Sequence, residues 1–413
     1  MNTEKLFLLR SGEMRLPQPQ NRLPFALDYQ TVICLVLLPP RDGRNNVLMK
    51  LHNYFASGLV AAGAVLATTC IPSQTASAAE PYKILNITQT NGTGGIDYVI
   101  ADSADRRVYI PRGNQIMVFN LDTYECLGAI PGTGGHGAVV DPKTQHGFSS
   151  SRPVSMFDAQ TMQPIKKIDV PTGPDGILFE PATEKVYILG HQTPQISVID
   201  AKDGTVAGSI DIGGAAEQAV SDLNGHVYVC LEDKAAIGVV DANTLKLTGT
   251  YPLQGKASGP AGLGIDTKNH ILFAMCRNPA TCVIMSADDG KILTTLPLAG
   301  SSDSGGFNPD TMEAFSSHGN GTLSIIKETS PTTFEVEQTV QTKPGGKCST
   351  LDTKTGHILV SAIEALPAPA AGDAATPAPT PAASPATNAP AGGQRRGGGR
   401  GGPGLLDLIV VGK

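Results

Sequence analysis

The stretch EKVYILGHQTPQISVIDAKDGTVAGSI, residues 184–210, contains three short segments rich in β-branched and aromatic residues, separated by a loop and a turn. Segments of this composition are typical of β-strands. Similar stretches recur along the chain, for example RRVYI at residues 106–110 and GHVYVCL at residues 225–231. The chain is therefore expected to consist largely of one repeated β-strand unit.

One aromatic or large apolar residue marks each unit, and successive marks lie 39 to 44 residues apart. The seven marks are Tyr109, Phe148, Tyr187, Tyr228, Leu272, Phe315 and Leu359. A period near 40 with several short strands per unit predicts an all-β fold, a seven-bladed β-propeller. A helical repeat of similar period is the competing interpretation, but segments such as IGVVD, residues 237–241, lack the apolar stripe of a helix.

Two further columns of polar residues repeat with the units. One is a turn column of Asp102, Asp141, Glu180, Asp222, Asp266, Asn308 and Asp352, and the other, at strand ends, includes Asn120, Asp158, Asp200, Asp241 and Ser286. Such side chains bond to their own backbone in turns. Both columns are therefore interpreted as structural rather than catalytic.

The two ends of the repeat region are predicted to meet. LLDLIVVGK, residues 405–413, aligns with third strands, and YKILNIT, residues 82–88, aligns with fourth strands. The N-terminal strand should therefore close the last blade and cover an edge that could otherwise pair with another chain. Between the second and third strands of that blade, residues 364–404 are rich in Pro, Ala and Gly and are predicted to be a disordered insertion.

On these features the chain resembles the YVTN-type β-propeller repeat proteins, through RRVYI, EKVYILG and GHVYVCL and through the later ISVIDAKDGTVAGSI. The resemblance covers about residues 82–413, although the tetrapeptide itself is missing and the second unit, HGFSSSRPVSMFDAQT, is degraded. It implies an exported bacterial seven-bladed propeller. The activities of such proteins are mostly unassigned, so the resemblance supplies no catalytic residue.

Residues 49–79 have the features of a signal peptide. A short basic start at Met49 and Lys50 precedes an apolar segment, Phe55 to Thr69, and the small residues Ala76-Ser77-Ala78 form a cleavage site. The alternative of a membrane anchor needs about twenty apolar residues, more than this segment offers. The mature propeller, residues 80–413, is accordingly expected in the periplasm or outside the cell, without a membrane span.

Two smaller interpretations concern the same region. A lipoprotein anchor at Cys70 is disfavoured because Thr69, rather than Gly, Ala or Ser, precedes it. Residues 1–48 show no periodicity, and a signal peptide normally begins at the initiator Met, so this segment is expected to be a disordered, wrongly assigned upstream extension.

The export prediction leaves five cysteines in an oxidising compartment. Cys276 and Cys282 flank a predicted hairpin, CRNPATC, and are expected to form a disulfide across it. A Cys-based metal site is disfavoured because no second Cys pair or His cluster lies nearby. Covalent haem is not expected, since no Cys-x-x-Cys-His motif occurs.

The charge and composition of the chain bear on which partners and cofactors it could bind. A net charge of -6 gives no electrostatic reason to expect nucleic acid, although three Arg in the insertion leave a polyanion-binding interpretation beside those of a solvated loop or a cell-wall tether. The absence of Trp argues against a quinone-cofactor dehydrogenase, whose blade contacts are expected to be Trp-rich. We expect a monomer.

One further column falls at the start of the first strand of each unit, where propellers usually bind ligands. Its members are Asp97, His136, Asp175, Glu217, Ala261, Asp303 and Lys347, and six of the seven are ionisable. The column is interpreted either as a ligand-binding ring at the channel mouth or as a solvated rim. Five residues on second-to-third strand loops of the same face could add an anion-binding or carbohydrate-binding group: Arg112, Arg152, His191, Arg277 and His318.

The sequence thus predicts an exported propeller that binds a small polar ligand, a cation or a protein partner at the channel mouth without catalysis. The alternative is a metal-dependent hydrolase of the lactonase kind, in which a bound cation activates water. Asp175, Glu217 and His136 are the candidate metal ligands. Carboxylates favour Ca²⁺ or Mg²⁺, whereas a histidine shifts the preference toward transition metals.

Overall fold

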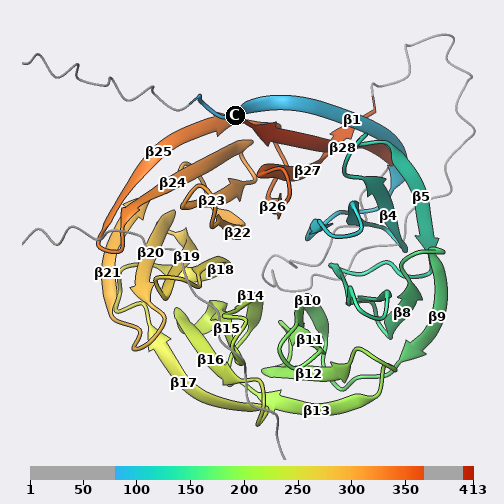
Figure 1. Ribbon diagram of the computed structural model, residues 1–413, viewed down its shortest axis with the longest axis horizontal. Helices are drawn as coiled ribbons and strands as arrows, with labels where there is room; N and C mark the ends of the chain where they lie inside the picture. Colours follow the sequence, from blue (N-terminus) through green and yellow to red (C-terminus); the bar gives the residue numbers. More distant parts are fainter. Residues whose placement is uncertain (1–79, 367–402) are drawn as a thin grey trace, which may run out of the picture. The chain divides into compact units, whose positions relative to one another are not determined.

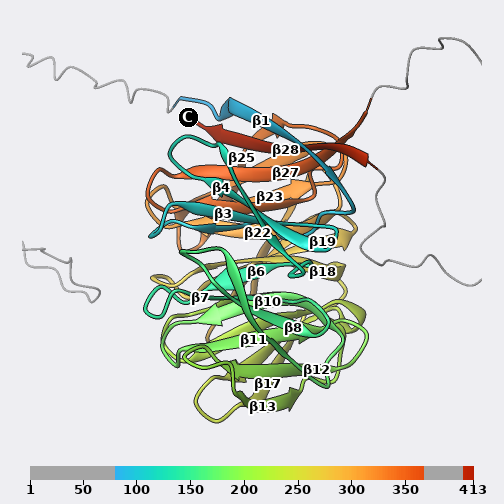
Figure 2. The same ribbon diagram turned by 90° about the vertical axis from the view of Figure 1, so that its right-hand side faces the viewer.

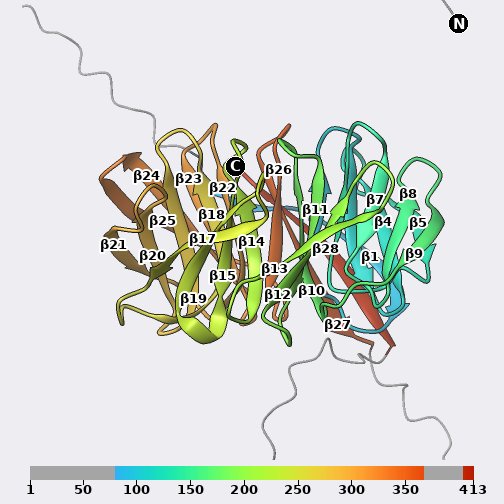
Figure 3. The same cartoon turned by 90° about the horizontal axis from the view of Figure 1, so that it is seen from below.

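The computed structural model describes residues 80–366 and 403–413. In these residues seven four-stranded antiparallel sheets stand in a ring, so the fold is a seven-bladed β-propeller (Figure 1). The first strand of each blade lines the centre and the fourth lies on the outside. Figure 3 shows the ring edge-on, with inner strands such as β14 and β26 upright and outer strands such as β13 tilted.

The first three blades use twelve strands in chain order. Blade one holds β2 (Ile100–Asp102), β3 (Arg107–Arg112), β4 (Gln115–Asn120) and β5 (Cys126–Pro131). Blade two holds β6 (Ala138–Val140), β7 (His146–Ser149), β8 (Val154–Asp158) and β9 (Gln163–Ile168). Blade three holds β10 (Pro174–Glu180), β11 (Lys185–Gly190), β12 (Gln195–Asp200) and β13 (Val206–Asp211).

Blades four to six follow the same order. Blade four holds β14 (Ala216–Ser221), β15 (His226–Leu231), the 3₁₀ helix η1 (Glu232–Lys234), β16 (Ala236–Asp241) and β17 (Lys246–Pro252). Blade five holds β18 (Ser258–Asp266), β19 (Ile271–Asn278), β20 (Thr281–Ser286) and β21 (Ile292–Pro297). Blade six holds β22 (Ser302–Asn308), β23 (Glu313–His318), β24 (Thr322–Ser330) and β25 (Thr333–Gln341).

Blade seven joins both ends of the chain, as predicted. It comprises β26 (Cys348–Asp352), β27 (His357–Ala365), β28 (Pro403–Gly412) and, outermost, β1 (Lys83–Thr93). The pairing of β1 with β28 runs antiparallel from Lys83 opposite Gly412 to Thr93 opposite Pro403. Figure 2 shows the blue β1 beside the red β28.

The insertion in blade seven is shorter than predicted. Strands β27 and β28 still pair at Glu364 with Leu405 and at Ala365 with Gly404, so both predicted boundaries fall inside strands. The rest of the predicted insertion, residues 367–402, lies outside the described residues, as do the predicted signal peptide and the upstream segment. Within the described residues no helix has the length and apolar character needed to cross a membrane.

The core lies between neighbouring blades. All seven repeat-marking residues sit in second strands and are buried, with at most 5% of their surface exposed. One cluster joins Tyr187 and Val198 of blade three to Val227 and Val240 of blade four. Because each sheet buries its faces against the next, closure of the ring is what leaves no blade face uncovered.

The two polar columns make the predicted turn contacts. In the turn column, the side chain of Asp141 accepts a bond from the backbone N–H of Lys143, and Asp352 does the same for Lys354. In the strand-end column, Asp241 accepts bonds from the backbone N–H groups of Asn243 and Thr244. These contacts confirm a structural role for both columns.

The predicted disulfide is wrong. Cys276 and Cys282 are both free. In the β19–β20 hairpin, Cys276 lies opposite Thr281 and Met275 lies opposite Cys282. The two sulfurs are one register position apart and therefore face opposite sides of the blade, where they join different core clusters.

Candidate functional site: a charged ring at the channel mouth

Eight charged or titratable side chains meet at one end of the central channel. Six come from the ends of strands predicted to line the mouth: Asp97, His136, Asp175, Glu217, Asp303 and Lys347. Two more, His191 and Arg277, come from the loop after β11 and from the end of β19. We call these eight residues the charged ring, and the cavity of about 550 Å³ that they line the cup.

Acidic and basic side chains alternate around the charged ring. Lys347 Nζ lies 3.1 Å from Asp97 Oδ1, and His136 Nδ1 lies 2.7 Å from Asp97 Oδ2 and 3.2 Å from Asp175 Oδ1. His191 Nδ1 follows at 3.9 Å from Asp175 Oδ2 and 3.3 Å from Glu217 Oε1.

Arg277 and Lys347 complete the circuit. Arg277 lies 3.2 Å from Glu217 Oε1 and 2.7 Å from Asp303 Oδ1, and Lys347 lies 3.0 Å from Asp303 Oδ2. Every blade contributes at least one member, and each neighbouring pair of blades is joined by one of these contacts. The charged ring therefore closes the propeller electrostatically at this end.

Arg277 explains the one apolar member of the sequence column. Ala261 of blade five is fully buried and offers no charge. Arg277, from the second-to-third strand connection of the same blade, reaches between Glu217 and Asp303 instead. Blade five thus takes its place in the circuit from a different strand.

The acids of the charged ring differ in proton affinity. Burial raises the pKa of Asp175 to about 6, because its charged neighbours only partly compensate for lost solvation. Burial would also raise the pKa of Glu217, but contacts with His191 and the Arg277 charge overcome it and hold that pKa below its usual range. For Asp97, bonds from His136 and the Lys347 charge likewise outweigh burial and lower the pKa.

The neighbouring carboxylates also change the proton affinity of the two histidines in the charged ring. The contact with Glu217 raises the pKa of His191 to about 9, and the bond to Asp97 raises the pKa of His136. Both imidazoles therefore favour the protonated form while they are flanked only by carboxylates. A protonated histidine between two acids occupies the place that a bound cation could take.

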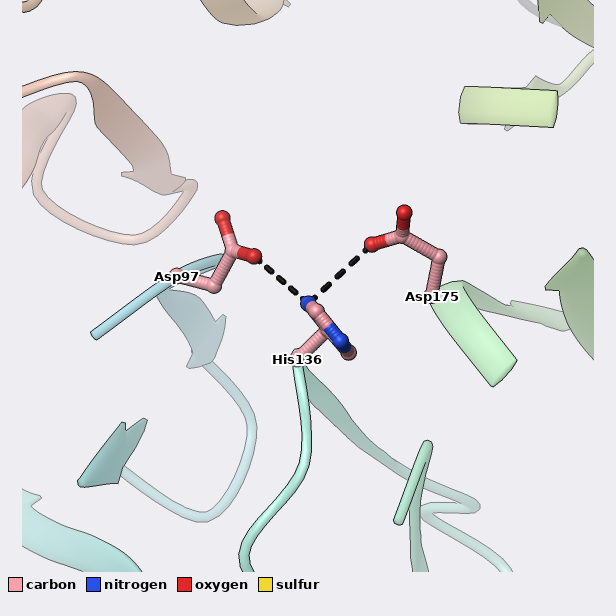
Figure 4. Close-up of side chains that lie close together, drawn as sticks. All are labelled: Asp97, His136 and Asp175. Carbon is pink, nitrogen blue, oxygen red and sulfur yellow. Dashed lines mark hydrogen bonds and ion pairs between the residues drawn. The ribbon is translucent and has the colours of Figure 1, made fainter. Parts of the chain in front are cut away.

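The described residues contain two groups whose ligand atoms converge closely enough for a metal ion. One is Asp97, His136 and Asp175, shown in Figure 4, and the other is Asp175, His191 and Glu217. Within each group the ligand atoms all lie within 4.8 Å of one another. The predicted metal ligands Asp175, Glu217 and His136 thus divide between two groups that share Asp175.

The floor of the cup is polar and crosses the channel. The Tyr98 hydroxyl donates to Glu217 Oε2 at 3.0 Å, which joins blade one to blade four. The Gln218 side chain donates to the Gly305 carbonyl at 2.8 Å and accepts from the Leu263 N–H at 3.0 Å. Below this floor, a second cavity of about 590 Å³ is lined largely by apolar residues such as Leu178 and Phe307.

Two of the five predicted loop residues lie away from the cup. Arg112 is 1% exposed, and its guanidinium donates to the carbonyls of Gly92, Gly94 and Gly404, so it joins β3 to the closing strands of blade seven. His318 is fully buried, and its Nε2 lies 3.0 Å from Ser324 Oγ. Both residues belong to strand ends rather than to loops, and the prediction that they contribute to the mouth is wrong.

The other three loop residues lie at or beside the cup. Arg277 and His191 belong to the charged ring. Arg152 is exposed and lines a smaller cavity of about 230 Å³ that also borders His136 and His191. A cationic group thus stands next to the cup without an ion pair to the charged ring.

Sequence reasoning missed Glu232 and Tyr98. Glu232, in η1, forms an ion pair with Arg277 Nη1, and its Oε2 lies 3.6 Å from His191 Nε2. The available signal for Glu232 is its place directly after the strand VYVCL, on a second-to-third strand loop of the same face. Tyr98 follows Asp97 directly, but nothing local indicates that its hydroxyl crosses the channel.

Comparisons with known proteins support the fold alone. No family model matches the chain, and no curated protein matches it either. Among solved structures, U3-55K aligns with a TM-score of 0.58 at 10% identity, over 68% of this chain and 92% of that one. The RRP9 WD40 repeats align with a TM-score of 0.59 at 10% identity, over 68% and 91%.

A chain of the mitotic checkpoint complex is similar as well, with a TM-score of 0.60 at 11% identity over 75% of this chain and 96% of that one. All three likenesses lie far below the identity at which function can be transferred. They support the β-propeller fold alone.

Proposed function

We propose that the protein binds a divalent transition-metal ion in the cup, through Asp97, His136 and Asp175, and that it acts by binding rather than by catalysis. One observation carries the proposal: two carboxylates approach the same ring nitrogen, at 2.7 Å and 3.2 Å. A single N–H cannot satisfy both acids fully, whereas a divalent cation among the three groups would neutralise both.

The ligand types favour a transition metal over Ca²⁺. Ca²⁺ takes six to eight oxygen ligands, whereas imidazole nitrogen suits Zn²⁺ and its neighbours in the first transition row. Two carboxylates and one histidine leave coordination positions open for water or for a small polar ligand. Zn²⁺ is therefore the first ion to test, with Mn²⁺ second and Ca²⁺ as the expected weak binder.

The competing interpretation treats the charged ring as purely structural. The circuit of ion pairs does join all seven blades, so removing a member could lower stability whether or not a metal binds. Metal-dependent stabilisation separates the two interpretations, because a ligand present at 100 times its dissociation constant adds about 2.7 kcal/mol to the unfolding free energy.

The test is calorimetric titration with ZnCl₂, followed by thermal melting with and without the ion. The unaltered protein should bind and should melt at a higher temperature with Zn²⁺. Asp97→Asn should reduce affinity. The matched control is Asp288→Asn. Asp288, in the turn that follows β20, forms another Asp–His pair with the exposed His270, which lies in the turn before β19. Unchanged melting of the unaltered protein with Zn²⁺ would remove the proposal.

The hydrolase alternative keeps one supporting observation. Arg277 and Lys347 lie elsewhere around the same cup and could hold the carbonyl or carboxylate oxygens of a substrate, while a metal held by Asp97, His136 and Asp175 would supply an activated water. Turnover of lactones or esters by the Zn²⁺-loaded protein, lost in Asp97→Asn, would favour this function over simple binding.

The proposal extends to the repeat family of the protein and to its location in the cell. The repeat segments support a YVTN-type propeller, and residues 49–79 support export to the periplasm or beyond. N-terminal sequencing of the secreted protein should find a start near Ala79 or Glu80. A mature chain that still carries residues 1–48 would contradict the export.

A further inference from the structure

We propose that the cup holds two metal ions rather than one, bridged by the carboxylate of Asp175. The inference rests on the proposed function and deepens it, because it predicts a second ion with its own ligands. The second ion would be bound by Asp175, His191 and Glu217.

The two oxygens of Asp175 face different histidines. Oδ1 lies 3.2 Å from His136 Nδ1, and Oδ2 lies 3.9 Å from His191 Nδ1. A carboxylate that presents one oxygen to each of two ligand groups is a common bridge in two-metal sites, where the ions lie about 3.5–4 Å apart. Asp175 is the one residue that belongs to both groups, so the bridge needs no movement of a strand.

The second ligand group is the more buried of the two. The Glu217 side chain is only 9% exposed, and its Oε1 lies 3.3 Å from His191 Nδ1. That nitrogen is shielded from solvent and has no well-aligned hydrogen-bond acceptor among the residues that the structure describes. The ligand atoms of Asp175, His191 and Glu217 thus converge without a well-aligned hydrogen bond among them, and Arg277 Nη1 holds Glu217 Oε1 in position at 3.2 Å, so a cation could complete the group.

Glu232 supports His191 from behind. Its Oε2 lies 3.6 Å from His191 Nε2, the ring nitrogen opposite the proposed ligand atom. Metal-bound histidines usually present their other nitrogen to a carboxylate, which fixes the orientation of the ring. Arg277 in turn contacts both Glu232 and Glu217 and keeps the two carboxylates in place.

Charge agrees with two ions. Asp97, Asp175 and Glu217 supply three negative charges, and both histidines are neutral when they bind a metal. Two divalent ions would therefore leave a charge of one positive unit among these ligands, since the two other acids of the cup, Asp303 and Glu232, are balanced by Arg277 and Lys347.

The stoichiometry of Mn²⁺ binding tests the inference. Calorimetric titration of the full chain should give two ions per protein, and electron paramagnetic resonance at saturation should show the signal of a spin-coupled Mn²⁺ pair. Glu217→Gln and His191→Ala should each reduce the stoichiometry to one and abolish the coupled signal. Asp175→Asn should abolish the coupled signal as well, because the bridge is lost.

Two controls keep the outcomes distinct. Asp222→Asn alters an Asp–His pair in a turn between first and second strands and should leave two ions bound. Thermal melting of each variant identifies those that fail to fold, and using both His191→Ala and Glu217→Gln guards against the loss of either. One ion in the unaltered protein, unchanged in both variants, would overturn the second site but leave the proposed function intact. No bound Mn²⁺, together with no Zn²⁺-dependent rise in the melting temperature, would overturn both.

Discussion

Arg277 is the residue on which the charged ring depends most. It contacts Glu217, Glu232 and Asp303, and its side chain is 13% exposed. Without it, three carboxylates would face one another in a partly buried site. Its position could be predicted only in part from the sequence, which placed it on the correct face but did not indicate that it replaces the missing charge of Ala261.

Arg277→Met should therefore destabilise the protein strongly. The apolar stem is kept, but the partners lose their cation, and breaking such a buried pair costs about 3–5 kcal/mol. Chemical denaturation measures the loss. Lys143→Met is the matched control, since Lys143 pairs with Glu184 at an exposed position and should show no measurable change. Equally small losses in both variants would contradict a buried circuit.

Glu328 provides a pH-dependent prediction away from the cup. It is 3% exposed, its Oε1 accepts a bond from Asn269, and burial, with a smaller contribution from Asp266, raises its pKa from 4.5 to about 7. The folded state therefore holds the proton more tightly than the unfolded state does. The contribution of this group is fully present below pH 4.5 and is lost as the pH rises through 7.

Glu328→Gln should remove that pH dependence. The amide resembles the protonated acid, so stability should be similar at pH 5 and higher than that of the unaltered protein at pH 8, by up to about 3 kcal/mol. Urea denaturation at the two pH values measures the difference. A variant that is equally destabilised at both would show that the carboxylate is ionised and well solvated in the folded state.

At the scale of elements, β1 closes blade seven and is also fixed to blade six. The Tyr82 hydroxyl donates to Glu313 Oε2 at 2.6 Å, and Lys413 Nζ lies 2.7 Å from Glu313 Oε1. Both ends of the propeller chain thus meet on one carboxylate. Removal of β1 would expose the edge of β28 and part of the core beneath it.

Deleting residues 82–88 should consequently lower the melting temperature far more than replacing residues 367–402 by a two-residue Asn-Gly linker. The second change joins strands that already pair at Ala365 and Gly404, and loop closure changes by only about 0.6 kcal/mol per doubling of length. Differential scanning calorimetry of the two altered proteins measures the difference. Similar melting temperatures would contradict the closure of blade seven by β1.

The elements were largely predictable from the sequence because each blade repeats the same local signals. The marking residues, the turn column and the closing strand all lie where the period places them. The predicted disulfide was wrong because two cysteines that flank a tight loop can still point to opposite faces of the sheet. A shift of one register position decides whether they share a face. Burial at a strand end, as for His318, likewise depends on neighbouring blades and leaves no local pattern.

For the whole molecule, closure of the ring has an electrostatic component at both ends of the channel. The charged ring joins the blades at the cup, while at the turns between first and second strands Arg106 binds Asp352 through two bonds of 2.6 Å and 2.7 Å, which ties blade one to blade seven. The column of ionisable residues predicted that a charged mouth would exist. Its alternation of acids and bases follows from contacts between blades and could not be predicted from the spacing alone.

The most direct test of the metal-binding cup is anomalous diffraction from crystals of the protein grown with Zn²⁺. The proposal predicts a peak in the cup, about 2.0–2.2 Å from ligand atoms of Asp97, His136 and Asp175. A second peak beside His191 and Glu217 would support the bridged pair. Zinc bound only at exposed histidines such as His226 or His270, with none in the cup, would contradict the central claim.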